Sequence, residues 1–194
     1  GNRCDFCFVD GNPDGARTTL FIRDDDYRLS FRHGNFATLS NLKDKDVRRI
    51  LEYRLSPLYV SVHATDTEVR RRLLRNPKAP AILEQLAMFM AGGIQFHAQI
   101  VLVPGMNDGP VLERSLAQLY EMGEGILTVS IVPVALTSFS RHALVRSPRA
   151  AEAMLTGRAQ ANGVMLRGWS GRPDVPPFPE LWKLRAAAVT VRRR

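Results

Sequence analysis

The chain has 194 residues, of which 45% are hydrophobic, so it can bury one sizeable core. No apolar run approaches the length of a membrane span and no signal peptide is visible, so no membrane partner is expected. The formal net charge of +8 comes from residues 141–194, which carry 11 basic and 3 acidic groups, whereas residues 1–140 carry 16 of each. Such a basic segment is typical of a nucleic-acid-binding arm or of a solvated, disordered end.

The only two cysteines of the sequence, Cys4 and Cys7, form a C-x2-C pair. Two thiolates at this spacing can bind one metal centre from a tight turn, and they can also form a redox dithiol. A closed zinc site needs four ligands, and the sequence offers only scattered histidines besides this pair: His33, His63, His97 and His142. A thioredoxin-like motif should follow a strand, but nothing precedes the pair. The composition does not resemble a secreted disulfide framework, so we predict a cytoplasmic protein.

The sequence starts at Gly1 without a methionine, and we expect natural sequence upstream of it. A cysteine directly before Gly1 would complete the pattern C-x3-C-x2-C. Three thiolates at that spacing leave one iron of a [4Fe–4S] cluster without a protein ligand, and this iron is then open to a small molecule.

The first elements after the cysteines are short. Residues 16–23 fit either a helix or a strand, and the three adjacent carboxylates at 24–26 are expected to be solvated. Alternation at 27–31 predicts a strand, and the Gly-, Asn- and Ser-rich residues 33–41 predict the loop that follows it. An amphipathic helix is expected at 43–55.

A strand is predicted at residues 58–63, with polar groups on one face and apolar groups on the other. Tyr59, Ser61 and His63 share the polar face. A lone histidine is commonly a core or surface residue with one backbone partner, but Ser61 beside His63 on the same face favours a ligand site.

The rest of the chain alternates helices and strands. Amphipathic and apolar patterns predict helices at 67–75, 81–91, 110–122 and 148–160, and strands at 94–103 and 126–134. Thr65 is predicted to cap the helix at 67–75. This order predicts an α/β fold with a parallel sheet and right-handed crossovers. Loops that follow the strands would then share the ligand-binding edge of the sheet: 34–38, 61–65, 105–108 and 135–138.

Several stretches of the sequence together resemble radical SAM proteins: CDFCFVD, IRDDDYRLSF, GNFATLSN, SPLYVSVHATD, QIVLVPGMNDG and VSIVPVALT. They are most similar to radical SAM proteins of unknown substrate that carry a PDZ-like domain in front and a domain of unknown function behind. Those proteins have been labelled iron–sulfur oxidoreductases. The resemblance covers residues 2 to about 140 and implies a partial (βα)6 TIM-like barrel with parallel strands and outer helices. It makes residues 1–140 a radical SAM core without its first strand and first cluster cysteine, and residues 141–194 a basic segment that is divergent or poorly ordered.

The resemblance also implies the cofactors and the residues that bind them. In this family three cysteines hold a [4Fe–4S] cluster whose open iron binds S-adenosyl-L-methionine (SAM), and Cys4 and Cys7 match two of them. The aromatic residue before the last cysteine, Phe6 here, packs near the adenine, and Arg70 would pair with the SAM carboxylate. The full set of SAM-binding residues implied by the resemblance is Phe6, Phe8, Gly34, Asn35, Thr38, Ser61, His63, Arg70 and Asn107.

Some loops also resemble those of the rRNA adenine-methylating radical SAM enzymes, but two departures argue against transferring that activity. The SAM-contacting asparagine of their Pro-x-Asn motif is Ala135 here, and their second, methyl-carrying cysteine has no counterpart. No general acid or base can be assigned.

Three functions stay open at this point. The first is a radical SAM enzyme that cleaves SAM reductively, acts on an unknown substrate and takes electrons from a donor such as a ferredoxin or flavodoxin. The second is an iron–sulfur or metal-binding redox protein without SAM chemistry. The third is an RNA-binding or RNA-modifying protein that uses the basic tail, and this function could coexist with the first.

Overall fold

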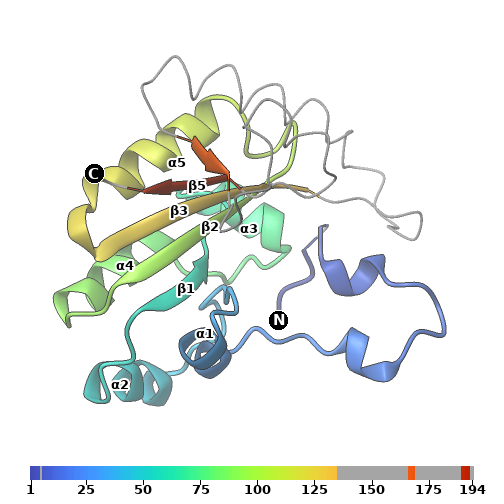
Figure 1. The fold of residues 1–194 in the computed structure, drawn as a ribbon, viewed down its shortest axis with the longest axis horizontal. Helices are drawn as coiled ribbons and strands as arrows, with labels where there is room; N and C mark the ends of the chain where they lie inside the picture. Colours follow the sequence, from blue (N-terminus) through green and yellow to red (C-terminus); the bar gives the residue numbers. More distant parts are fainter. Residues whose placement is uncertain (5, 135–165, 169–188, 193–194) are drawn as a thin grey trace.

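The computed structural model describes residues 1–4, 6–134, 166–168 and 189–192 (Figure 1). Its helices are α1 (Tyr27–His33), α2 (Asp44–Glu52), α3 (Thr67–Leu74), α4 (Ile82–Ala91) and α5 (Pro110–Glu121). Short 3-10 helices are η1 (Phe8–Gly11), η2 (Thr18–Phe21) and η3 (Gly123–Gly125). The strands are β1 (Leu58–Ser61), β2 (Phe96–Leu102), β3 (Ile126–Pro133), β4 (Leu166–Gly168) and β5 (Val189–Arg192).

These strands form one sheet in the order β1-β2-β3-β5-β4. The pairs β1–β2 and β2–β3 are parallel, which confirms the predicted α/β sheet. Strand β5 is antiparallel to β3 and to β4, and it takes the edge of β3 where a further parallel strand of a barrel would pair. Within the described residues the sheet is open, so the TIM-like barrel stays a prediction.

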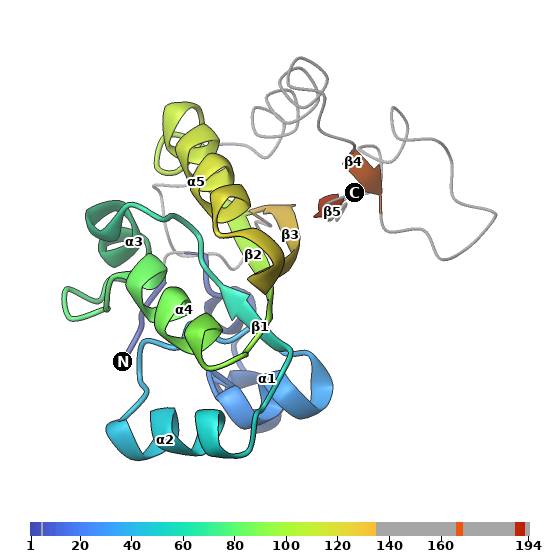
Figure 2. The ribbon, with the colours of Figure 1, turned by 90° about the vertical axis from the view of Figure 1, so that its left-hand side faces the viewer.

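Side chains of β2 alternate between the two faces of the sheet. Phe96, Ala98 and Ile100 are fully buried and join the main core with residues of α4, such as Leu86 and Phe89. Figure 2 shows α3, α4 and α5 on this side of the strands. Half-buried polar residues take the opposite face, where the rings of Tyr59 and His97 stack with centroids 4.6 Å apart and the next residue across the sheet is Thr128. Tyr59 therefore lies on the polar face, as its period-two pattern predicted. The strand predicted at 58–63 ends at Ser61, and His63 follows it with a φ of 63°.

The strand predicted at 27–31 is wrong, because this segment belongs to helix α1. The Asp26 carboxylate accepts a hydrogen bond from a backbone N–H of the first turn, as a helix N-cap does. Gly34 ends the helix with a φ of 73°, a conformation that glycine adopts without strain. Tyr27 and Ser30 are buried and lie one turn apart on the same face of the helix.

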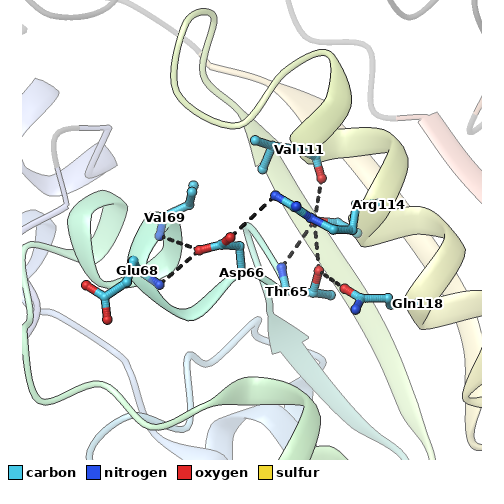
Figure 3. A network of polar contacts seen from close by, with 8 residues as sticks. Thr65, Asp66, Glu68, Val69, Val111, Arg114 and Gln118 are labelled. Atoms are coloured by element: carbon cyan, nitrogen blue, oxygen red, sulfur yellow. Dashed lines mark hydrogen bonds and ion pairs between the residues drawn. The ribbon is translucent and has the colours of Figure 1, made fainter.

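A polar network ties the start of α3 to α5 (Figure 3). Asp66, and not Thr65 as predicted, caps α3 by accepting hydrogen bonds from backbone N–H groups of the first turn. The Thr65 hydroxyl instead donates to Gln118 Oε1 at 2.6 Å, and its backbone N–H donates to the buried Ser115 hydroxyl at 3.1 Å. Arg114 pairs with the Asp66 carboxylate at 3.4 Å. Helix α3 follows the polar end of β1, and these contacts with α5 fix the position of its first turn.

The remaining element predictions are confirmed to within a few residues wherever the structure describes them. Helices α2 to α5 and strands β1 to β3 lie where the sequence patterns placed them, and residues 16–23 contain η2. The helix predicted at 148–160 lies outside the described residues. None of the helices in the described part of the chain combines the length and the apolar character that crossing a bilayer requires.

Candidate cofactor site

Cys4 and Cys7 lie on one tight turn, in which the Cys7 N–H donates to the Cys4 carbonyl at 3.1 Å. The side chain of Phe6 packs into a hydrophobic cluster whose buried members include residues that follow β1, β2 and β3: Ala64, Val103 and Val134. In Figure 1 the N-terminal segment lies on the side toward which these parallel strands point. The cysteine turn therefore sits at the carboxyl ends of the strands, the edge at which α/β sheets bind ligands.

The Cys4 thiol holds its proton more tightly than an ordinary thiol. Burial and the neighbouring Cys7 thiol raise the pKa of Cys4 to about 12, so Cys4 keeps its proton at neutral pH when no cation is near. A metal ion would replace this proton and neutralise both sulfurs. In the described ranges, no group of three or more His, Cys, Asp and Glu side chains is placed to hold a metal. Among the described residues this pair supplies two thiol donors, and thiolates suit soft metal centres such as an iron–sulfur cluster.

His63 lies directly beside the cysteine turn. Its ring meets the ring of Phe6 edge-on, with centroids 4.9 Å apart, and only 4% of the residue is exposed. Its Nδ1 accepts a hydrogen bond from the Val101 N–H at 3.3 Å. Burial and the charge of Arg70 lower the pKa of His63 to about 3, so the imidazole is neutral at pH 7. Phe6 and His63, two of the predicted SAM-binding residues, are therefore in contact and form a largely apolar surface beside the cysteines.

Replacing His63 by asparagine should weaken the pH dependence of stability. The unfolded chain binds a proton at this position below the usual histidine pKa of about 6.5, whereas the folded chain stays neutral down to a pKa of about 3. Between these values the unfolded state binds more protons, so stability falls as the pH falls. From pH 7 to pH 5 the unfolding free energy of the native chain should drop by about 2 kcal/mol more than that of His63→Asn.

Urea unfolding followed by circular dichroism at the two pH values measures this difference. Asparagine is the replacement because His63 has a φ of 63°, which asparagine tolerates. His33→Asn is the control, because His33 is exposed and this variant should keep the native pH dependence. Equal slopes for the native chain and His63→Asn would contradict the prediction.

A polar network anchors the chain just before the cysteine turn. Asp25 accepts hydrogen bonds from the Thr38 N–H at 2.6 Å, the Thr38 hydroxyl at 2.7 Å and Asn2 Nδ2 at 3.1 Å. Asn2 Oδ1 accepts from the Ser40 hydroxyl at 3.0 Å and from Asn76 Nδ2 at 2.9 Å. Asn2 was not among the predicted site residues. Asp25 was expected to be solvated, but its carboxylate accepts these three hydrogen bonds and is half-buried. No spacing in the sequence connects position 2 with position 25, so only the fold reveals this pair.

Gly34 and Asn35 lie in the loop that leads from α1 to the edge of β1. A Cβ on Gly34 would be 3.5 Å from the ring of Tyr59, an ordinary contact, so its positive φ and not crowding explains the glycine. Asn35 Nδ2 donates to the Asp24 carboxylate at 2.7 Å, beside the Asp25 network. Phe8 is 69% exposed and lies on the surface, in contrast to Phe6.

Arg70 is an interior side chain with an exposed fraction of 0%. Its guanidinium donates to the carbonyl oxygens of Thr38 at 2.6 Å, Val62 at 3.1 Å and Pro80 at 3.4 Å, and it reaches the Ser61 carbonyl at 3.5 Å. Burial lowers the pKa of Arg70 to about 10, which leaves it charged at neutral pH. This placement favours a structural role, as a tie between the ends of neighbouring segments, over the predicted contact with the SAM carboxylate. Ser61 itself is 6% exposed.

Asn107 is also fully buried and bonds through both atoms of its amide. Its Oδ1 accepts from the Val103 N–H at 2.7 Å. Its Nδ2 donates to the carbonyl oxygens of His63 at 2.7 Å and Val101 at 2.8 Å. Asn107 therefore joins the loops that follow β1 and β2 and holds His63 in its position.

The fold and the site together define a class of protein: an α/β domain with a cysteine turn at the carboxyl ends of its parallel strands. The chain belongs to the family of radical SAM-like domains, whose sequence model matches residues 1–129. This match includes the cysteine turn and every described element up to the start of β3. A comparison with curated proteins gave no match. The predicted membership of the radical SAM superfamily is confirmed, and the likeness to proteins with a PDZ-like domain stays a prediction.

Proposed function

We propose that this chain is a radical SAM enzyme, which binds a [4Fe–4S] cluster and SAM and uses them to start radical chemistry on a substrate. The observation that supports this most directly is the position of the cysteine turn. Phe6 lies between the two cysteines in sequence. Its side chain packs against His63 and against the hydrophobic residues that follow the parallel strands. Membership of the radical SAM-like family gives this arrangement its chemical meaning.

The residues of the chain divide into ligands, walls and supports. Cys4 and Cys7 would bind two irons of the cluster, and a further thiolate would bind the third. When bound, the cluster and SAM together supply a 5′-deoxyadenosyl radical that removes a hydrogen atom from the substrate. Phe6 and the neutral His63 would form an apolar wall on one side of the cysteine turn. The other residues in the proposed SAM site are Gly34, Asn35, Thr38 and Ser61. Arg70 and Asn107 are buried supports beneath them, and Phe8 lies on the surface.

The proposal extends to partners and compartment. Reduction of the cluster needs an electron donor such as a ferredoxin or flavodoxin, and two free thiols fit a reducing cytoplasm. The domain would form a partial (βα)6 barrel, similar to that of the radical SAM proteins with a PDZ-like domain in front. A second candidate, RNA binding by residues 141–194, rests on their 11 basic against 3 acidic groups.

Anaerobic reconstitution tests the proposed function. The chain is loaded with iron and sulfide, once as it stands with excess small thiol and once with a single cysteine added before Gly1. Each preparation is reduced with dithionite and given SAM, and 5′-deoxyadenosine is measured by liquid chromatography. We expect cleavage in the chain with the added cysteine and its loss in Cys4→Ala and Cys7→Ala. S-adenosylhomocysteine, which lacks the sulfonium, is the control and should yield no 5′-deoxyadenosine.

The outcomes separate the candidate functions. If a cluster forms but SAM is not cleaved, the protein is an iron–sulfur redox protein, and the proposal of a radical SAM enzyme is overturned. If no cluster forms in either preparation, the cysteine pair has another role. RNA binding with steep salt dependence, lost on removal of residues 141–194, would then favour the second candidate.

A further inference from the structure

Arg23 contacts one of the two cysteine sulfurs. Its Nη1 donates a hydrogen bond to Cys7 Sγ at 3.1 Å. Its Nη2 donates to both carboxylate oxygens of Asp10, at 2.9 and 3.1 Å. A guanidinium from outside the cysteine turn thus reaches back across 16 residues of sequence to Cys7.

The same contacts fix where the guanidinium can lie. Asp10 belongs to η1, which begins directly after Cys7, and its backbone N–H donates to the Cys7 carbonyl at 3.0 Å. Asp10 is therefore attached to the turn that it helps to organise. The planar fork of an arginine holds a carboxylate with one nitrogen and leaves another free to face the sulfur. The pKa of Arg23 lies above its ordinary value: burial lowers it, but the hydrogen bond to Asp10 and the Asp10 charge raise it by more, so the guanidinium is charged.

We propose that Arg23 is a positioning residue that orients the Cys7 sulfur and raises the reduction potential of the cluster. This inference rests on the proposed function, because it requires a cluster on Cys4 and Cys7. Reduction adds one negative charge to the cluster. A positive N–H donor to a ligating sulfur stabilises the reduced form more than the oxidised form, and hydrogen bonds to sulfur are among the factors that set cluster potentials.

The test is the midpoint potential of the reconstituted cluster, followed by electron paramagnetic resonance during a redox titration. Arg23→Gln removes the charge, and its equilibrium constant for one-electron reduction should fall about tenfold, which corresponds to about 59 mV. Arg23→Lys keeps the charge without the fork and should shift the potential less. Arg28→Gln is the matched control: Arg28 forms a comparable ion pair with Asp26, and this variant should keep the native potential.

Arg23→Met provides a second route to the same answer. It removes the charge and the N–H donors but keeps a side chain of similar shape, so it should lower the potential at least as much as Arg23→Gln. This variant decides the matter if Arg23→Gln fails to assemble a cluster. Native potentials in both Arg23→Gln and Arg23→Met, in preparations that still cleave SAM, overturn the role of Arg23 and leave the proposed function standing. If the unaltered chain with its added cysteine assembles no cluster, the proposed function and the role of Arg23 both fail.

Discussion

Arg70→Met should lower the free energy of unfolding by about 3 kcal/mol or more, because each buried carbonyl that loses its donor costs about 1–3 kcal/mol. The methionine side chain fills a similar space but donates no hydrogen bond. The carbonyl oxygens of Thr38 and Val62 would lose their contacts at 2.6 and 3.1 Å to the guanidinium. Urea unfolding followed by circular dichroism measures the change.

Arg72→Met is the matched control for this prediction. Arg72 lies on the same helix as Arg70 but is exposed, so its replacement should change the unfolding free energy by less than about 0.5 kcal/mol. Arg70→Lys keeps the charge but not the planar set of donors, and it should fall between the two methionine variants. Equal stabilities of Arg70→Met and Arg72→Met would contradict the structural role of Arg70.

The second large effect is expected for Asn107→Leu, with a loss of about 3 kcal/mol for three buried backbone groups that lose their partners. The loss should be localised as well as global, because Asn107 Oδ1 is the acceptor for the Val103 N–H. Amide hydrogen exchange should therefore accelerate at Val103 more than at Ile100 in the middle of β2. Urea unfolding and exchange measured by nuclear magnetic resonance report the two effects.

Asn12→Leu serves as the control for Asn107. The Asn12 side chain makes one exposed hydrogen bond, from Nδ2 to the Leu20 carbonyl at 2.8 Å, so its loss should cost less than about 1 kcal/mol. If the two leucine variants were equally stable, or if exchange at Val103 did not change, Asn107 would not be the link between the loops.

Most elements after residue 43 could be predicted because each extends over several repeats of its own period. The segment 27–31 could not, because five residues fit both the strand and the helix period. Its conformation is decided by partners far along the chain: the Ser30 hydroxyl donates to the Tyr59 carbonyl at 2.9 Å and accepts from the Tyr59 N–H at 2.8 Å. At the edge of β1, Ala37 of the following loop pairs with Val60.

The candidate site was predictable for residues that belong to a recognisable motif or lie at the end of a predicted strand. The family resemblance led to Phe6, and the polar face of the predicted strand at 58–63 led to His63; the structure places these two residues in contact. The burial of Arg70 had a signal that we did not use, since Arg70 lies three and four residues before the buried Leu73 and Leu74, on the apolar stripe of its helix. The contacts of Arg23 had no such signal, because they depend on how the loop after η1 returns to the cysteine turn.

The anchoring of Asn2 has a consequence for how a cluster would enter the protein. Asn2 bonds to Asp25 and Thr38, and the next residue, Arg3, donates its N–H to the Leu74 carbonyl at 2.9 Å. Fixing the backbone of one residue costs about 1–2 kcal/mol, and here the fold bears that loss of entropy before any iron arrives. Cys4 and Cys7 are held on a turn that is already formed, so binding of the proposed cluster would not have to order these two ligands first.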